Sequence, residues 1–155
     1  MAEPLHGSAL TILKCSKYSG DSKVPFPMRP FVFWSGAYNA GLSLLLLCPP
    51  LYRVLGLNIC APIWGWLIAG FLGFTSAVLI LAARDLRRRA SLVYWEALLR
   101  YVAALLLIPA GLFGDIGLIA IPMGLGDLAI GMVYMFGLPK ELGISHHALL
   151  CDRLE

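Results

Sequence analysis

Charged side chains are scarce in this sequence, and their scarcity limits the class of protein it can encode. Asp, Glu, Lys and Arg make up 14% of the 155 residues, whereas hydrophobic residues make up 59%. A chain of this length forms one domain, and a soluble domain of that size could not bury so much apolar surface. The net charge of +3 does not indicate a nucleic-acid partner, because the basic residues lie at the ends of apolar segments instead of along one face.

Motifs of catalytic and metal-binding sites are also lacking. The four cysteines show neither a C-x-x-C motif nor zinc-site spacing, which argues against a thiol-oxidising membrane enzyme. His146, His147 and Cys151 do not have the spacing of a known metal site. The apolar segments contain no Ser/His/Asp set and no pair of haem ligands. We therefore predict no metal and no catalytic residue, and no cofactor other than a quinone or lipid taken up from the membrane.

What the sequence does contain is a series of long apolar runs. A helix needs about 20 apolar residues to cross the hydrocarbon core of a bilayer. Pro49 and Pro50 end the first run, and Pro62 fits the first turn of the second. We predict an all-α, four-helix transmembrane bundle with short connectors over residues 31–136, between polar tails at 1–30 and 137–155. The predicted spans are residues 31–48, 62–83, 91–113 and 116–136.

The basic residues predict how this bundle is oriented. Four spans place both termini, and the turn between the second and third spans, on one side of the membrane. The opposite side carries only Arg53. Because Lys and Arg favour the cytoplasmic side, we predict that both termini are cytoplasmic. The basic residues on that side are Lys14, Lys17, Lys23, Arg29, Arg84, Arg87, Arg88, Arg89, Lys140 and Arg153.

The third predicted span carries two charges, Glu96 and Arg100, which are costly in lipid and need partners on neighbouring helices. With a rise of about 1.5 Å per residue, Arg100 lies about 14 Å from the start of its span at Ser91. Asp127 reaches the same depth from the other side of a core of about 30 Å. We predict an ion pair between Arg100 and Asp127, because a guanidinium can serve two acceptors at once. Glu96 one helical turn away and Asn39 in the first span complete this polar cluster.

Two interpretations of the polar cluster stay open. It could hold the four helices in one register and do no chemistry. Alternatively, it could bind a polar headgroup, or relay protons through a carboxyl group that keeps its proton in the low-dielectric interior. These interpretations lead to different functions, because the first needs only a folded bundle and the second needs a ligand or a proton path.

Two further groups of residues lie at the ends of the spans. A basic turn between the second and third spans could hold anionic lipid headgroups, although such turns more commonly act only as topology signals. Its arginines are Arg84, Arg87, Arg88 and Arg89. On the other side, Cys48 and Cys60 flank a connector in a compartment where disulfides can form. A bridge between them is one alternative, and two free thiols are the other.

Three features of the chain resemble small bacterial four-helix membrane proteins of a loosely DoxX-like kind. They are the segment FVFWSGAYNAGLSLLLLCPPLYRVLGL, the turn Ala83-Arg84-Asp85, and a basic residue in the third span followed by an acidic one in the fourth. The basic residue is often Lys in that group, and Arg100 stands in its place here. The resemblance covers residues 31–136 and implies a helical bundle in the bacterial inner membrane. It also implies a quinone-linked or redox-partner role known for some relatives, and it identifies no catalytic residue.

The short connectors leave almost no domain outside the membrane that could act on a soluble substrate. We therefore predict a non-catalytic accessory or scaffold subunit, surrounded by lipid, that packs against larger membrane proteins or against copies of itself. The alternative is a protein that binds a lipophilic small molecule such as a quinone, or relays protons, at the layer of Glu96, Arg100 and Asp127. No nucleic-acid partner is expected.

Overall fold

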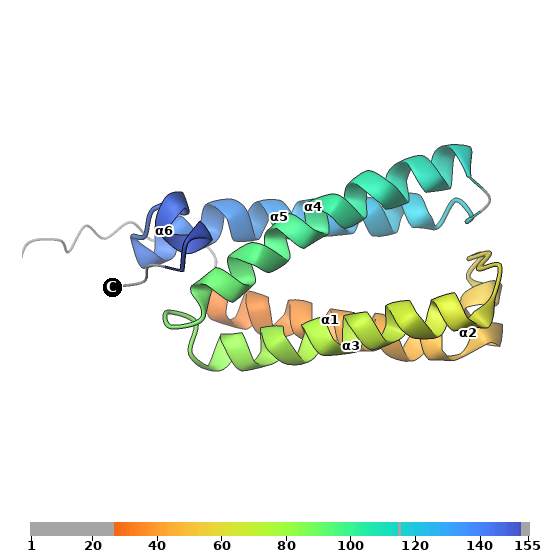
Figure 1. The fold of residues 1–155 in the computed structure, drawn as a ribbon, viewed down its shortest axis with the longest axis horizontal. Helices are drawn as coiled ribbons and strands as arrows, with labels where there is room; N and C mark the ends of the chain where they lie inside the picture. Colours follow the sequence, from red (N-terminus) through yellow and green to blue (C-terminus); the bar gives the residue numbers. More distant parts are fainter. Residues whose placement is uncertain (1–26, 115, 153–155) are drawn as a thin grey trace, which may run out of the picture.

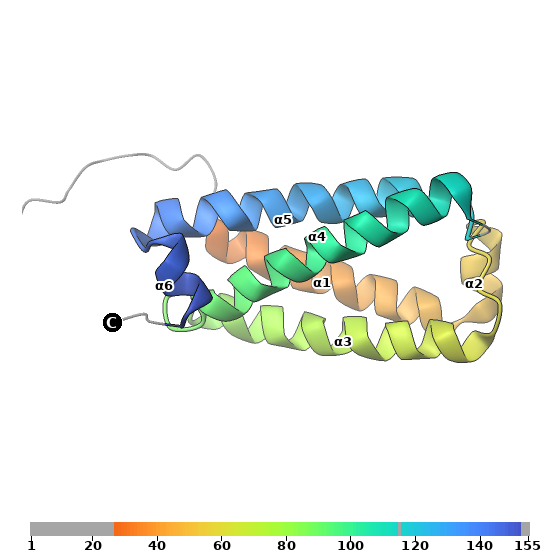
Figure 2. The same ribbon diagram turned by 45° about the horizontal axis from the view of Figure 1, so that its top comes forward.

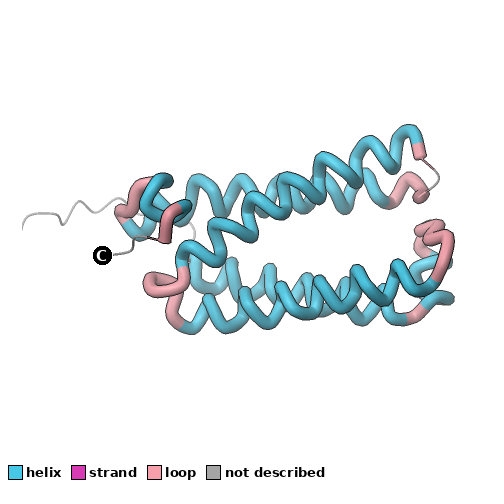
Figure 3. The backbone as a smooth tube through the Cα atoms, viewed as in Figure 1, coloured by secondary structure: helices cyan, strands magenta, loops and turns pink. Residues whose placement is uncertain are grey.

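The computed structural model describes residues 27–114 and 116–152, and every regular element in this part of the chain is a helix (Figure 3). Four helices are long and apolar enough to cross a membrane. The predicted all-α four-helix bundle is therefore confirmed, and its composition indicates a membrane protein. The long helices are α1 (Met28–Leu47), α3 (Pro62–Arg84), α4 (Ala90–Phe113) and α5 (Ala120–Leu142), and the short ones are α2 (Pro49–Val54) and α6 (His146–Leu150).

Prolines lie at both ends of the first long helix and at the start of the second. The first helix begins at Met28 rather than at residue 31, because Pro30 lies in its first turn, where the missing N–H of proline costs nothing. The helix ends at Leu47, and the single residue Cys48 separates it from the pair Pro49 and Pro50, which begins α2. Pro62 occupies the first turn of α3, as the sequence predicts.

The fourth long helix lies further along the chain than predicted. The span was predicted at residues 116–136, but α5 runs from Ala120 to Leu142 and continues through Pro139. Gly117, with a φ of 107°, turns the chain before the helix, and Gly143, with a φ of 66°, ends it. Both glycines adopt a left-handed conformation that other residues rarely reach.

The described part of the segment 137–155, for which a polar C-terminal tail was predicted, contains the end of α5 and the short helix α6. Leu138 and Leu149 are both fully buried, and these apolar anchors hold the segment against the bundle. In α6, the Ser145 side chain accepts a hydrogen bond from the backbone N–H of Ala148 and so caps the helix. Most of the predicted N-terminal tail, residues 1–30, lies outside the described residues.

The long helices form two antiparallel pairs, α1 with α3 and α4 with α5 (Figures 1 and 2). Glycines allow a close approach within each pair. A Cβ atom added to Gly36 would lie 2.9 Å from Cγ1 of Ile80, and one added to Gly124 would lie 2.8 Å from Cγ1 of Ile108. The two pairs share few contacts with each other, so the side chains that do join them are important for the fold.

Three regions connect the two helix pairs. The basic end of the bundle comprises the turn 85–89, the start of α1, the end of α5 and α6, and it contains the larger apolar core. The connector end comprises α2 and the loop before α5, where the backbone N–H of Asn58 donates to the carbonyl of Ile116 at 2.8 Å. Between these two ends, the contact is made by polar side chains.

The short helix α6 packs across the start of α4 at the basic end (Figure 2). Its apolar anchor is Leu149, and polar contacts lie on either side. The Ser91 hydroxyl donates to the carboxylate of Asp152, and the Tyr94 hydroxyl lies 3.2 Å from Nδ1 of His146. The segment after α5 therefore covers the basic end of the bundle.

Candidate functional site

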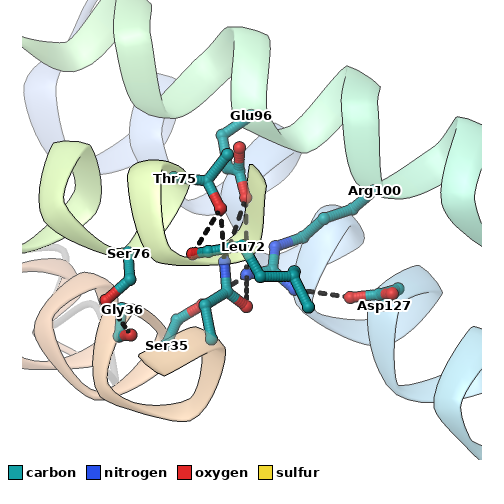
Figure 4. A network of polar contacts seen from close by, with 9 residues as sticks. Ser35, Gly36, Leu72, Thr75, Ser76, Glu96, Arg100 and Asp127 are labelled. Atoms are coloured by element: carbon teal, nitrogen blue, oxygen red, sulfur yellow. Dashed lines mark hydrogen bonds and ion pairs between the residues drawn. The ribbon is translucent and has the colours of Figure 1, made fainter. Parts of the chain in front are cut away.

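Arg100 lies at the centre of the polar cluster and is only 3% exposed. Its Nη1 donates to Oδ1 of Asp127 at 2.5 Å (Figure 4). Its Nη2 donates to the Ser35 hydroxyl and to Oδ1 of Asn39, both at 3.0 Å. One guanidinium on α4 thus binds acceptors on both α1 and α5, and so joins the two helix pairs.

Glu96 occupies the edge of the same cluster. Its Oε1 lies 3.6 Å from Nη2 of Arg100 and accepts a long hydrogen bond of 3.5 Å from Nδ2 of Asn39. The same amide nitrogen donates to the Thr75 hydroxyl at 3.2 Å, and that hydroxyl donates to the carbonyl of Leu72. The structure therefore brings together Asn39, Glu96, Arg100 and Asp127. Thr75 on α3 joins this cluster through its hydrogen bond with Asn39.

Local packing explains why these side chains meet at one level. The Ser43 hydroxyl donates to the carbonyl of Ala69, and the Ser76 hydroxyl donates to the carbonyl of Gly36, both at 2.7 Å. These two bonds lie on either side of Asn39 along α1, so they fix the register of α1 against α3. Gly131 on α5 lies close to the backbone of α4, which allows Asp127 to reach Arg100.

The sequence prediction missed Tyr134. The Arg100 guanidinium carbon lies 5.9 Å from the centre of its ring, within the range of a cation–π contact. The Tyr134 hydroxyl and Nε of Arg100 are both buried and have no hydrogen-bond partner in the described part of the chain. Helical spacing could have found this residue, because it lies two turns after Asp127 on the same face of α5.

A groove between α3 and α4 reaches one edge of the cluster. Its volume is about 450 Å³, and Thr75 and Glu96 line it among aromatic and aliphatic side chains. The Glu96 side chain is 10% exposed, whereas that of Arg100 is 4% exposed. Glu96 is therefore the charged member of the cluster that a molecule in the groove would meet.

The arginines of the predicted lipid site all lie exposed at the basic end. None of them forms a salt bridge with a described residue. One of the four also caps the preceding helix, since Nη1 of Arg89 donates to the carbonyl of Leu81 at 3.1 Å. The binding of lipid headgroups by Arg84, Arg87, Arg88 and Arg89 stays a prediction.

The cysteines and histidines do not form a site in the described part of the chain. Cys48 and Cys60 are exposed free thiols, so the alternative of a bridge between them is not realised in this structure. Cys151 lies 3.8 Å from Nε2 of His147, whereas His146 contacts Tyr94. No group of three metal-binding side chains occurs among the residues that the structure describes.

Comparisons with protein-family models, curated proteins and solved structures find no match to this chain. The resemblance to DoxX-like proteins therefore stays a prediction. The geometry itself defines a class of protein: a four-helix membrane protein with a buried, multiply hydrogen-bonded arginine and an adjoining groove between two helices.

Proposed function

We propose that this protein binds a lipophilic small molecule that has a compact polar head, in the groove between α3 and α4. The observation that carries the proposal is the position of Glu96, a carboxylate at intramembrane depth that lines an otherwise apolar groove. The groove has a volume of about 450 Å³ and opens on the outer surface of the bundle, where Phe74 and Trp95 in its walls are 68% and 53% exposed. The head would contact Glu96 and Thr75, and the apolar body would lie on the groove walls.

In this proposal the rest of the cluster orients the site and performs no reaction. Asn39 and Arg100 both contact the same carboxylate oxygen, so they hold Glu96 in one position beside the groove. We further propose that the protein resides in a bacterial inner membrane with both termini in the cytoplasm. The exposed arginines at the basic end support this orientation and would contact anionic lipids.

A substitution that fills the groove tests the proposal. Leu99 lines the groove, and replacing it with Trp would occupy the space without changing the charge of the cluster. Leu105 lies on the same helix, is 73% exposed and does not line the groove, so Leu105→Trp is the matched control. Native mass spectrometry in mild detergent should find a bound lipophile on the wild type and on Leu105→Trp, and should lose it on Leu99→Trp. Equal ligand occupancy in all three proteins would contradict the proposal.

The second candidate function is that of an accessory or scaffold subunit. The sparse contact between the two helix pairs, together with the many apolar side chains on the outer surface, favours packing against another membrane protein or a second copy. Purification in mild detergent separates the two candidates. Stoichiometric recovery of large membrane proteins would favour the accessory role, whereas a lipid-soluble ligand recovered without such partners would favour ligand binding.

A further inference from the structure

Glu96 has one carboxylate oxygen without a partner. Its Oε1 receives both of the contacts from Asn39 and Arg100, whereas its Oε2 has no hydrogen-bond partner within residues 27–114 and 116–152 (Figure 4). The side chain is nine-tenths buried and lines the groove between α3 and α4. The neighbouring side-chain donors already have acceptors, because the Thr75 hydroxyl donates to the carbonyl of Leu72 and the Asn39 amide donates to the Thr75 hydroxyl. The hydrogen-bonding capacity that the ionised Glu96 side chain has left for a ligand is therefore that of an acceptor.

The formal charge of the cluster adds a second constraint on the ligand. Arg100 carries one positive charge, and it faces two carboxylates, Asp127 and Glu96. The shorter contact, at 2.5 Å, is with Asp127, and the contact with Glu96 is 3.6 Å. With both acids ionised the formal sum is minus one, and Glu96 is the less directly compensated of the two acids. An uncompensated negative charge at intramembrane depth is costly, so a cation in the groove would stabilise the cluster.

The walls of the groove suit a cation with an apolar body. Phe71 and Phe74 on α3 and Trp95 on α4 line the groove beside Glu96, and aromatic faces attract cations, most strongly where water is excluded. The remaining lining side chains, apart from Thr75, are aliphatic. Among the described residues no Lys or Arg lines the groove, and Arg100 contacts Glu96 at Oε1 without lining the groove.

We propose that the groove between α3 and α4 binds a lipophilic cation whose ammonium head donates a hydrogen bond to Oε2 of Glu96. The apolar chain of the ligand lies against the aliphatic walls, and the head lies among the aromatic rings. This inference rests on the proposed function and names the chemical class of its ligand. A neutral carbonyl head, such as that of a quinone, supplies neither the charge nor the donor, and a fatty acid is repelled by the carboxylate.

Three probes test the inference on the full-length protein in nanodiscs of zwitterionic lipid. Dodecylammonium, dodecanol and dodecanoate have the same chain and differ only in the head. The wild type should bind dodecylammonium about tenfold more tightly than dodecanol, as one desolvated cation contact provides, and should bind dodecanoate least. Equal binding of dodecylammonium and dodecanol to the wild type would overturn the inference and leave the proposed function standing. Failure of all three probes to bind would overturn both.

Variants connect this preference to the carboxylate. Glu96→Gln keeps the shape of the side chain but removes its charge, so it should lose most of the preference for dodecylammonium while keeping the affinity for dodecanol. Glu141→Gln is the matched control, because Glu141 is an exposed carboxylate at the basic end, away from the groove. A preference that survives Glu96→Gln would overturn the inference. The comparison of probes on the wild type keeps the test decisive even if Glu96→Gln does not fold.

Discussion

At the scale of the residue, the fold depends on the protein groups that accept hydrogen bonds from Arg100. A charged side chain inside a bilayer is stable only when its donors are satisfied by protein groups. Here Asp127, Ser35 and Asn39 take three of those donor interactions, and they come from helices on both sides of Arg100. Lysine could not bind these acceptors in the same way, because its three donors radiate from a single nitrogen.

Removal of this guanidinium should destabilise the bundle strongly. Arg100→Met leaves one carboxylate, one hydroxyl and one amide without their donor and removes the positive charge beside Glu96. We therefore expect a loss of about 3–5 kcal/mol in the free energy of unfolding. The measurement is an SDS titration in mild detergent followed by circular dichroism. Arg53→Met is the control, since Arg53 is exposed at the connector end and forms no salt bridge with a described residue.

A double variant separates the ion pair from the rest of the cluster. When both members of a buried pair are replaced by apolar residues, the cost is often much smaller than when one is removed. Arg100→Met with Asp127→Leu should therefore unfold at a higher SDS concentration than Arg100→Met alone. If the two substitutions instead destabilise additively, Arg100 and Asp127 are not coupled and the ion pair is not what holds the two helix pairs together.

At the scale of the element, each helix pair depends on small residues. Gly36→Ala places a Cβ atom 3.2 Å from the carbonyl of Ser76 and 2.9 Å from Ile80, and such overpacking costs about 1–3 kcal/mol. Gly41→Ala, on the same helix, has no atom within 4 Å of the new Cβ, and its stability should be unchanged or slightly higher. Thermal unfolding measured for both variants checks the difference, and equal melting temperatures would contradict the close packing of α1 against α3.

The short helix α6 should detach without unfolding the bundle. Leu149 is fully buried, whereas its neighbour Leu150 is 42% exposed, so the two leucines form a matched pair. Leu149→Ala should remove about 2–5 kcal/mol of local stability, and the segment after Gly143 should become sensitive to protease while α3 and α4 stay protected. Leu150→Ala should behave like the wild type. Cleavage at the same rate in both variants would show that Leu149 does not anchor α6.

The elements also show what the sequence could and could not predict. The four long helices follow from length and hydropathy alone, and the end of α1 and the start of α3 follow from proline. The extent of α5 does not follow from length and hydropathy. Leu138 and the end of the helix belong to a stretch with few apolar residues, and their burial depends on tertiary contacts. The packing of α6 against Tyr94 could not be predicted either, since one buried leucine gives no periodic signal.

At the scale of the whole molecule, the cluster was more predictable than its surroundings. Intramembrane charges are so costly that Glu96, Arg100 and Asp127 can be placed together from depth and charge alone. The groove could not be predicted in this way, because it depends on how closely α3 approaches α4, and no periodicity in the sequence encodes that distance. To predict the cation–π contact between Arg100 and Tyr134, one must know how α5 is rotated about its axis, and helical spacing restricts that rotation without fixing it.

The orientation of the whole molecule can be tested with its own cysteines. Cys60 lies exposed at the connector end, and Cys151 lies exposed at the basic end, so the two thiols report on opposite sides of the membrane. If the arginines place the basic end in the cytoplasm, a membrane-impermeant maleimide should label a variant that keeps only Cys60 in intact cells. A variant that keeps only Cys151 should be labelled only after the membrane is permeabilised. The reverse pattern would contradict the predicted orientation, and labelling of both thiols in intact cells would contradict the assignment of the two ends to opposite faces.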